Sequence, residues 1–381
     1  MNVLYVTHTT DLSGANRSMI QLIRELRQGY GVTPFVVFPK IDIELGISIK
    51  DVCLNENIAF LEHQVTNFKK KKPLSIIKRI YYIIFNTFYI LHIYWLLRKR
   101  SFDLVHTNSS VNDTGAYLAK LFKCPHIWHL REYGDLDFGL YSLLGPKYEE
   151  FVYKKADVFI AISKSIKNHF ENVIDPLKIR LIYNGIKSEK GSMLSKHESE
   201  KLQLCMVGRV EENKNQLEAL KAVAFLIKEK ILAFHLTIIG RENEEYRMQL
   251  NRYIIENDLE AFVDIIGPRN DVPNILSCMD VGLMLSTSEA FGRVTIEFMM
   301  QNLAVVATKA GANEELIQDG KTGFLYSLGN VTELAHILKE LISNRPFVSE
   351  ISQNGLVYAQ NTFTSEINSN KIADLYKSLV C

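Results

Sequence analysis

The sequence predicts two doubly wound α/β domains in one chain. Short apolar, β-branched runs alternate with helical stretches throughout, which is the pattern of parallel sheets joined by right-handed crossovers. The chain has 381 residues, more than one hydrophobic core usually holds, because cores stop growing at roughly 250–300 residues. A polar stretch near the middle separates two such series. Ligands of paired domains of this kind are expected at the carboxyl ends of the strands.

The predicted strands form two groups. In the first half they are Val3–Thr7, Thr33–Phe38, Leu104–His106, Ile127–Leu130 and Val158–Ile162. In the second half they are Leu202–Val207, His235–Ile239, Val263–Ile266, Val281–Leu285, Ala304–Ala307 and Gly323–Tyr326. The stretch between the groups is rich in Ser, Lys, Glu and Gly and predicts an exposed linker. We therefore expect a first domain over residues 1–185, a linker over 186–200 and a second domain over 201–362.

Composition restricts the class of protein. Hydrophobic residues make up 47% of the chain and the net charge is +1, so a packed core is expected and no nucleic-acid partner is predicted. The five cysteines include no CxxC pair, which favours reduced core residues of a cytoplasmic protein over zinc or disulfide roles. The first residues form a strand pattern without the charged and apolar regions of a signal peptide.

Two carboxylates bracket a loop that leads into a helix. Glu289 and Glu297 stand in Ser286-Thr-Ser-Glu-Ala-Phe-Gly-Arg-Val-Thr-Ile-Glu297, directly after a predicted strand. Gly292 allows a close approach of the backbone, and Arg293-Val294-Thr295 forms the expected first helical turn, whose free N–H groups attract phosphate. Glu297 on the helix suits a vicinal diol such as a ribose, and Glu289 suits a hexose. The alternative is a pair of unrelated surface glutamates.

Two cations follow another strand. Arg209 and Lys214 come after Leu202–Val207 and Gly208, where they could neutralise a diphosphate leaving group in place of a metal ion. The alternative is a solvated charged loop, since Glu211 and Glu212 lie beside them. Together with the carboxylates, these cations predict a sugar-nucleotide site.

Three further residues of the first domain are candidates with open alternatives. His129 ends a strand beside other polar residues, which favours a site over a structural histidine. His106 has a similar place with fewer polar neighbours. Gly14 follows the first strand and precedes a helix expected at Arg17–Arg27, and a plain turn explains it equally well. The Asp135-Leu-Asp137 triplet has no supporting His or Glu cluster, so we interpret it as a solvated loop.

One segment combines basic ends with an apolar, aromatic centre. Residues 68–100 contain nine Lys or Arg and no Asp or Glu, and Ile80–Leu97 is almost wholly apolar. This pattern predicts an interfacial helix on an anionic membrane. A spanning helix is disfavoured because the stretch only just reaches across ~30 Å of hydrocarbon. The alternative is an ordinary domain helix that is buried on most sides.

With these residues assembled, the chain resembles the GT-B-fold retaining glycosyltransferases of family 4, or group 1. The family's Glu-x7-Glu matches Glu289 and Glu297, and its Gly-Arg…Lys-Gly loop matches Gly208, Arg209 and Lys214. Its Asn-Gly-hydrophobic hinge matches Asn184-Gly185-Ile186. A later Gly-Gly-x-x-Glu segment is similar to Gly311-Ala312-Asn313-Glu314-Glu315. The resemblance implies two Rossmann-like domains that face a central cleft, and a terminal helix over 363–380 that packs back on the first domain.

The resemblance also implies roles for the residues. Arg209 and Lys214 would bind the donor diphosphate, Glu297 the ribose and Glu289 the donor sugar. The remaining implied contacts are the backbone of Phe291, Gly292, Arg293 and Val294 near sugar and phosphate, Arg269 and Asn270 near the base, His129 near the reacting sugar, and Gly14 over the phosphates. The family's Lys-Gly is Lys214-Asn215 here, and Asn can adopt the left-handed conformation at modest cost, so we expect the turn to survive.

The sequence therefore predicts a retaining transferase that moves a hexosyl group from a UDP- or GDP-sugar to an acceptor hydroxyl without a metal or other cofactor. The expected acceptor is a saccharide or lipid-linked saccharide of surface polysaccharide synthesis, met at the inner face of the cell membrane through residues 68–100. The alternatives are another GT-B sugar-nucleotide enzyme, such as an epimerase or hydrolase, and an inactive membrane-associated binding protein.

Overall fold

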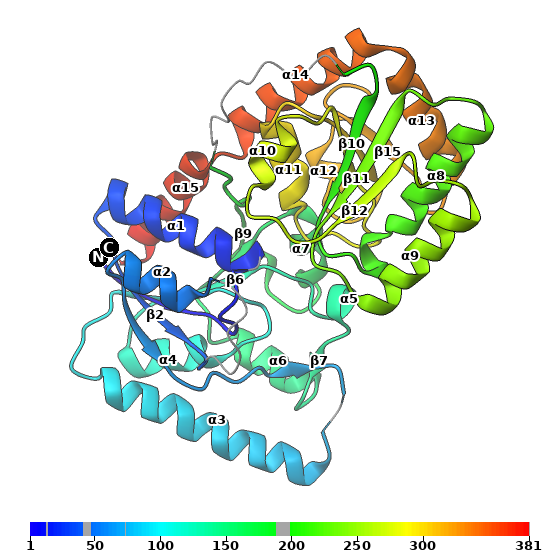
Figure 1. Cartoon of the computed structure of the whole chain (residues 1–381). Helices are drawn as coiled ribbons and strands as arrows, with labels where there is room; N and C mark the ends of the chain where they lie inside the picture. Colours follow the sequence, from blue (N-terminus) through cyan, green and yellow to red (C-terminus); the bar gives the residue numbers. More distant parts are fainter. Residues whose placement is uncertain (13, 41–46, 73, 188–198, 381) are drawn as a thin grey trace. The chain divides into compact units, whose positions relative to one another are not determined.

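The computed structural model describes residues 1–12, 14–40, 47–72, 74–187 and 199–380. They form two compact units, which Figure 1 colours along the sequence. Unit 1 comprises Met1–Lys187 and Ser365–Cys381, and unit 2 comprises Ser188–Thr364. Most of the predicted linker, residues 188–198, lies outside the described residues.

Unit 1 is built on a seven-stranded parallel sheet of order β3-β2-β1-β5-β6-β8-β9. The strands are β1 (Asn2–Val6), β2 (Thr33–Phe38), β3 (Ala59–Glu62), β5 (Leu104–Thr107), β6 (His126–Leu130), β8 (Val158–Ala161) and β9 (Ile179–Leu181). The five strands predicted for this half are all present. The sequence analysis missed β3 and β9 because they are short and partly exposed, so neither gives a continuous apolar run.

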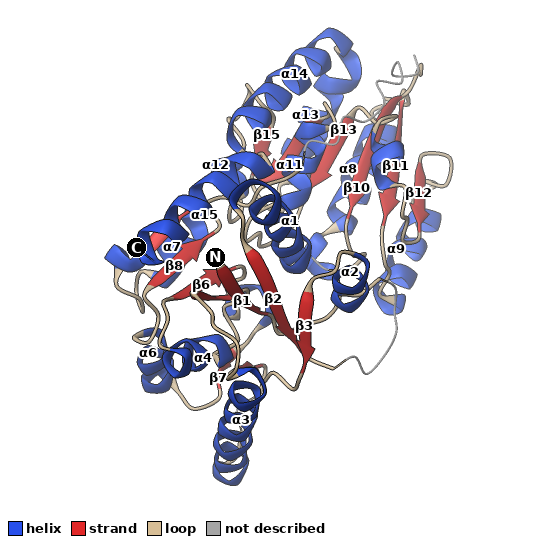
Figure 2. Cartoon of the chain, turned by 90° about the vertical axis from the view of Figure 1, so that its left-hand side faces the viewer, coloured by secondary structure: helices blue, strands red, loops and turns tan. Residues whose placement is uncertain are grey.

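Helices cover both faces of this sheet (Figures 1 and 2). They are α1 (Gly14–Tyr30), α2 (Ile49–Asn55), α3 (Ile76–Leu97), α4 (Thr114–Phe122), α5 (Asp135–Phe138), α6 (Pro146–Tyr153), α7 (Lys164–Phe170) and α15 (Ser365–Val380). One apolar cluster joins α1, α2 and α15 to the side chains of Val3 and Tyr5. A second joins α3 and α4 to Leu4 and Val6 on the opposite face, because successive side chains of a strand alternate between faces.

Unit 2 has a six-stranded parallel sheet of order β12-β11-β10-β13-β14-β15. Its strands are β10 (Leu202–Val207), β11 (Phe234–Ile239), β12 (Val263–Ile266), β13 (Val281–Met284), β14 (Ala304–Thr308) and β15 (Phe324–Tyr326). Its helices are α8 (Gln216–Lys228), α9 (Glu244–Glu256), α10 (Val272–Leu276), α11 (Arg293–Met300), α12 (Asn313–Leu316), α13 (Val331–Ser343) and α14 (Arg345–Thr362). All six predicted strands are present, and the prediction of two doubly wound Rossmann-like domains is confirmed.

Both sheets reverse their strand order at one point. In unit 2 the chain runs outward from β10 through β11 to β12, then returns to pair β13 with β10. In unit 1 the same reversal pairs β5 with β1. At such a switch point the loops leaving two neighbouring strands diverge to opposite faces and leave a crevice at the carboxyl ends. The loops after β10 and β13 are those that carry Arg209, Lys214 and Glu289.

Helix α3 is buried along only part of its length. Its buried residues, Asn86, Ile90, Ile93 and Leu97, all come from the C-terminal two thirds. In the N-terminal half, Ile77, Tyr81 and Ile84 are 67%, 57% and 57% exposed, and Figure 2 shows α3 extending beyond the rest of unit 1. It is the one helix among the described residues that is long and apolar enough to cross a membrane by length and composition. The alternative of a mostly buried helix does not fit these exposures.

The first two residues of the segment 68–100 are also interior residues. Phe68 is fully buried and Lys69 is 6% exposed. Lys69 Nζ lies 2.5 Å from Glu149 Oε1 and close to the rings of three aromatic residues. The short antiparallel pair β4 (Lys69–Lys70) with β7 (Tyr141–Ser142) places them there. The basic surface of this segment therefore begins after Lys69.

Three smaller expectations are corrected. Helix α1 begins at Gly14 rather than at the expected Arg17, so this glycine is the first helical residue. The Asp135-Leu-Asp137 triplet forms α5, where Asp137 accepts hydrogen bonds from the backbone N–H groups of Tyr133 and Gly134. Cys278 is exposed, unlike the buried Cys53 and Cys205.

The buried His126 makes the stability of unit 1 depend on pH. Burial lowers the pKa of His126 from about 6.5 to about 3, and the charge of Lys120 adds to this. Below pH 6.5 the unfolded chain binds a proton at His126. The folded chain does not bind this proton until the pH falls to about 3. Its stabilising contribution is therefore fully present above pH 6.5 and is lost as the pH falls.

We predict that His126→Gln flattens this dependence. Below pH 6.5 the free energy of unfolding of the wild type should fall faster than that of the variant by about 1.4 kcal/mol per pH unit. Urea unfolding at pH 9, 7.5, 6 and 5 measures both slopes, and the interval from pH 7.5 to 9 is the internal control in which the slopes should agree. Parallel curves below pH 6.5 would show that His126 is protonated in the folded protein.

Candidate functional site

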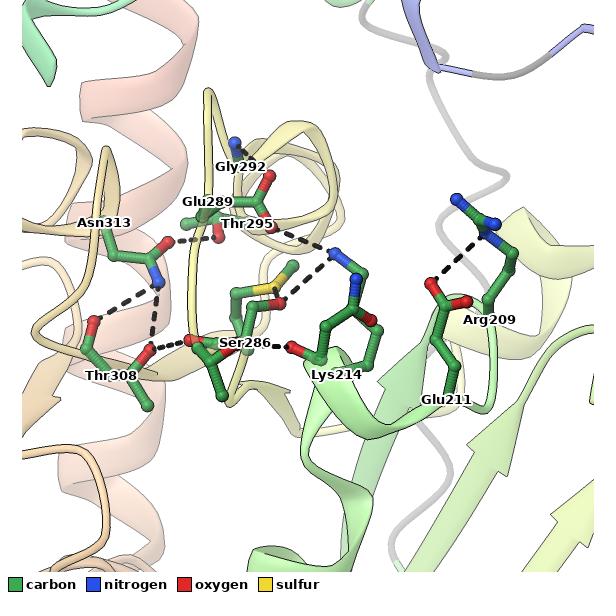
Figure 3. Close-up of polar contacts among 12 residues, drawn as sticks. Arg209, Glu211, Lys214, Ser286, Glu289, Gly292, Thr295, Thr308 and Asn313 are labelled. Carbon is green, nitrogen blue, oxygen red and sulfur yellow. Dashed lines mark hydrogen bonds and ion pairs between the residues drawn. The ribbon is translucent and has the colours of Figure 1, made fainter. Parts of the chain in front are cut away.

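Lys214 connects the two loops that leave the switch point of unit 2. Its Nζ lies 3.2 Å from Ser286 Oγ after β13 and 3.2 Å from Glu289 Oε2 in the same loop (Figure 3). The backbone N–H of Thr287 donates to the carbonyl of Asn213 at 3.0 Å, next to Lys214. Two residues that the sequence analysis selected independently are thus in direct contact, at the place where this fold binds ligands.

The backbone before α8 has the shape that the sequence analysis expected. Asn215 has φ 58° and ψ 38°, so it occupies the left-handed region that glycine usually fills, and the turn after Lys214 is preserved. Gly208 has φ 151°. A Cβ on Gly240 would lie 1.7 Å from the carbonyl oxygen of Gly208. The close approach of these two glycines sets the path of the loop that carries Arg209.

Glu289 is held on both sides. Its Oε1 accepts a hydrogen bond from the backbone N–H of Gly292 at 3.0 Å. Gly292, at φ 78°, forms the N-cap of α11, where a side chain would be strained. The Phe291 ring is 3% exposed and packs edge-on against Phe363, so Phe291 anchors the loop and only its backbone is available for a ligand.

A second segment of the chain contacts the backbone of Glu289. Gly311 lies so close that a Cβ would be 2.2 Å from the Glu289 carbonyl oxygen, and Ala312 donates to that oxygen at 2.8 Å. Asn313 accepts from Thr295 at 3.3 Å and donates to the Thr308 carbonyl at 3.3 Å (Figure 3). The segment 311–315, which the sequence analysis compared with a family motif, therefore holds the backbone of Glu289 in place.

The other charged candidates of unit 2 are each paired with a neighbouring charge of opposite sign. Arg293 Nε lies 2.8 Å from Glu297 Oε1 one helical turn away, with side chains 22% and 27% exposed. Arg209 is 62% exposed and 3.4 Å from Glu211. Arg269 lies 2.8 Å from Asp271, and its neighbour Asn270 is exposed. Cations and a helix N-terminus at this edge can bind an anion such as a diphosphate, and the nearby carboxylates can accept hydrogen bonds from hydroxyl groups.

The candidates of unit 1 lie at the carboxyl ends of its central strands. His129 on β6 is fully buried, and its Nδ1 is 3.0 Å from Nε2 of His106 on β5. Burial, together with the Arg131 charge, holds the pKa of both imidazoles well below its usual range. His106 Nδ1 is hydrogen-bonded to Tyr376 of α15. His106 is therefore a direct partner of His129, a contact that the sequence alone left open.

A second network of buried hydrogen bonds joins the ends of these strands to α1. Asn16 in the first turn of α1 accepts from Thr7 at 2.8 Å and from Asn108 at 3.3 Å. Arg131 donates to Asn108 at 2.9 Å and also to Asn184 in the predicted hinge. These hydrogen bonds fix the start of α1, and with it Gly14, against the ends of β5 and β6. Glu132 accepts from the Ser110 N–H at 2.8 Å.

Sequence reasoning missed several of these residues for identifiable reasons. Ser286 and Asn313 stood within quoted stretches, but their partners are distant in sequence. Tyr376 lies 270 positions from His106, and Arg131 follows a strand that was assigned by its apolar residues. Pairs of polar residues at the ends of neighbouring strands would have been the available signal.

Two family models match the chain in succession. The model described as Glycosyltransferase Family 4 matches residues 12–190, and the model described as Glycosyl transferases group 1 matches residues 192–357. Among curated proteins, an Escherichia coli UDP-Gal:alpha-D-GlcNAc-diphosphoundecaprenol alpha-1,3-galactosyltransferase is 25% identical over 76% of this chain and 79% of that protein. The N-acetyl-alpha-D-glucosaminyl L-malate synthase of Bacillus anthracis is 26% identical over 74% of this chain and 75% of its own.

Solved structures agree in fold over the whole chain. Anabaena HepE in complex with UDP and glucose has a TM-score of 0.81 at 21% identity and full coverage of both chains. A glycosyltransferase from Rickettsia africae has a TM-score of 0.82 at 22% identity, covering 100% of this chain and 98% of its own. The fold, the two consecutive family models and the relatives agree: the chain is a glycosyltransferase of the GT-B fold.

Proposed function

We propose that the chain is a retaining glycosyltransferase of family 4 that transfers a hexosyl group from a UDP- or GDP-sugar to an acceptor hydroxyl. The observation that carries this proposal is the position of Lys214 Nζ, between Ser286 Oγ and Glu289 Oε2 at the switch point of unit 2. A cation, a carboxylate and the N-terminus of α11 within one pair of loops suit a ligand that joins a diphosphate to a sugar. Anabaena HepE, a structural neighbour, was solved with UDP-glucose.

Charge stabilisation on the leaving diphosphate would drive the reaction. Lys214, Arg209 and the first turn of α11 would neutralise charge that builds on the diphosphate as the bond to the sugar breaks. These cations are positioned to do the work for which other transferases use a divalent metal, so we expect no metal requirement. In a front-face mechanism the leaving phosphate takes the acceptor proton, and the new bond keeps the anomeric configuration. Glu289 would orient the sugar, and Glu297 would bind the ribose.

We propose a lipid-linked saccharide as the acceptor, met at the cytoplasmic face of the membrane. The support is α3, whose exposed apolar residues continue along the N-terminal half and whose ends carry Lys78, Arg79 and Arg98 to Arg100. Apolar side chains can enter the headgroup boundary while the basic ends contact anionic lipid. The name of the E. coli relative gives a diphosphoundecaprenol-linked acceptor, which agrees with this reading.

The donor site predicts binding of one nucleotide series without metal. The screen uses UDP, GDP, ADP, CDP and their sugar conjugates with EDTA present, and only one nucleotide series should raise the melting temperature. The rise is measurable because a ligand at about 100 times its Kd stabilises the fold by about 2.7 kcal/mol. Glu297→Ala should weaken the binding of the active nucleotide about tenfold, the usual scale for a lost charge-assisted hydrogen bond.

Glu256→Ala is the matched control for this screen. Glu256 is an exposed glutamate at the end of α9, so its removal should leave nucleotide binding unchanged. Calorimetry on the three proteins gives the affinities. A requirement for added Mg²⁺, or equal affinity in wild type and Glu297→Ala, would contradict the proposed site, and free sugar or epimer formed without acceptor would favour an epimerase or hydrolase.

The membrane proposal predicts sedimentation with anionic vesicles. The wild type should bind phosphatidylglycerol-containing vesicles and bind phosphatidylcholine vesicles weakly. The triple variant Ile77→Ser, Tyr81→Ser and Ile84→Ser should bind at least about tenfold more weakly, because each buried apolar side chain contributes roughly 1.5–3 kcal/mol. These residues repeat at helical spacing on the half of α3 that is least buried, so the fold should persist.

The control variant removes exposed apolar residues elsewhere. Met248 and Ile255 on α9 are 63% and 64% exposed, and replacing both by Ser should leave vesicle binding intact. Equal binding by the α3 triple variant and the wild type would remove α3 as the contact. Failure of the wild type to sediment with anionic vesicles at moderate salt would remove the membrane proposal altogether.

A further inference from the structure

We propose that Tyr5, Tyr376 and His106 form a buried relay that fixes His129 in the tautomer with an unprotonated Nε2, the form in which this histidine can accept a hydrogen bond from a hydroxyl group of the sugar substrate. The four residues come from β1, α15, β5 and β6, and all of them belong to unit 1. The inference rests on the proposed function for its ligand. The proton positions follow from the contacts together with the burial of both imidazoles.

The proton count starts at the tyrosine pair. The Tyr376 hydroxyl donates to the Tyr5 hydroxyl at 3.2 Å. A hydroxyl has one proton to donate, so the Tyr376 oxygen can only accept from His106 Nδ1, its other partner. His106 therefore carries its proton on Nδ1. All three side chains are fully or almost fully buried, so water does not compete for these positions.

The count continues through the histidine pair. A neutral imidazole protonated on Nδ1 has an unprotonated Nε2, and His106 Nε2 faces His129 Nδ1 at 3.0 Å. His129 must supply the proton of this contact from Nδ1. Since burial and the nearby Arg131 disfavour a charged imidazole at either position, the second nitrogen of His129 remains unprotonated. The relay thus determines which tautomer His129 adopts, as second partners commonly do for histidine.

The remaining nitrogen points to a ligand. His129 Nε2 is buried and has no hydrogen-bond partner among the described residues, although buried polar atoms are nearly always paired. It lies at the carboxyl end of a central strand, where ligands of this fold bind. A bare lone pair attracts a hydroxyl proton and repels phosphate or carboxylate oxygens. The chemistry therefore selects a sugar hydroxyl and excludes the diphosphate.

The relay gives the C-terminal helix a part in the reaction. Tyr376 belongs to α15, whose start is fixed in unit 1 where Ser365 donates to Glu25 of α1 at 2.8 Å and where Gly185 approaches Ser365 so closely that a Cβ would lie 2.5 Å from its Cα. Tyr376 and His106 act through His129 and are positioning residues. Neither is expected to contact the sugar.

Nitrogen NMR reads the tautomers directly. In the full-length protein labelled with ¹⁵N-histidine, long-range ¹H–¹⁵N spectra at neutral pH separate protonated from unprotonated ring nitrogens. We expect a protonated Nδ1 and an unprotonated Nε2 for both His106 and His129, assigned by the loss of signals in His106→Gln and His129→Gln. Tyr376→Phe keeps the ring and removes the hydroxyl, so it should convert His129 to a mixture of tautomers.

Kinetics with two substitutions at one position test the role in transfer. His106→Leu removes the acceptor for His129 Nδ1, and kcat/KM should fall about tenfold, the scale of one hydrogen bond to substrate. His106→Gln retains an oxygen acceptor in place of Nε2, and kcat/KM should stay within about threefold of the wild type. If the role of His106 were purely structural, kcat/KM would fall in both variants in proportion to the loss in melting temperature, and His106→Gln would not restore it.

Two results would overturn the relay: a protonated His129 Nε2 in the wild type, or unchanged tautomers and kinetics in Tyr376→Phe and His106→Leu. The tautomer is measured without turnover. Failure of the proposed function would appear as no transfer by the wild type from any nucleotide sugar, and it is therefore distinguishable from failure of the relay.

Discussion

The ion pair between Lys214 and Glu289 connects the two loops on which the site of unit 2 depends. Lys214 belongs to the loop after β10 and Glu289 to the loop after β13, the two strands that meet at the switch point. Glu289 is also hydrogen-bonded to Gly292 at the start of α11, and its carbonyl is met by Gly311 and Ala312. A partly buried pair with several supporting contacts is worth more than an exposed one, so these loops hold their shape before a ligand arrives.

The same principle operates in unit 1, where one cation, Arg131, is held by uncharged side chains. Buried polar side chains at the ends of β1, β5 and β6 satisfy one another, from Asn16 through Asn108 to Arg131 and Asn184. In such a network each hydrogen bond limits the orientations open to the next side chain. The side chains are therefore positioned more sharply than by apolar packing. The cost is that each removed member leaves a buried partner unsatisfied. Arg131, two residues after His129, ties the end of β6 into this network.

The sequence predicted the architecture well because the buried strands of parallel sheets are continuous apolar runs. The missed strands β3 and β9 are short and partly exposed. Lys214 and Glu289 were predictable because both follow strands whose ends must meet. The partnership of His106 with Tyr376 was not, since nothing local signals a contact across 270 positions. Lys69 shows the opposite error: its place in a run of lysines indicated surface charge, whereas Glu149 and three aromatic rings enclose it.

The most direct test is a double-substitution cycle on Lys214 and Glu289, measured by calorimetry with the free nucleoside diphosphate and with its sugar conjugate. If Lys214 binds the diphosphate and Glu289 the sugar, Lys214→Met weakens the binding of the free nucleoside diphosphate about tenfold or more. Glu289→Gln leaves that affinity unchanged or higher, because a competing carboxylate is gone, and weakens only the conjugate. Equal loss of diphosphate affinity in both single variants would contradict the account, since the pair would then only support the loops.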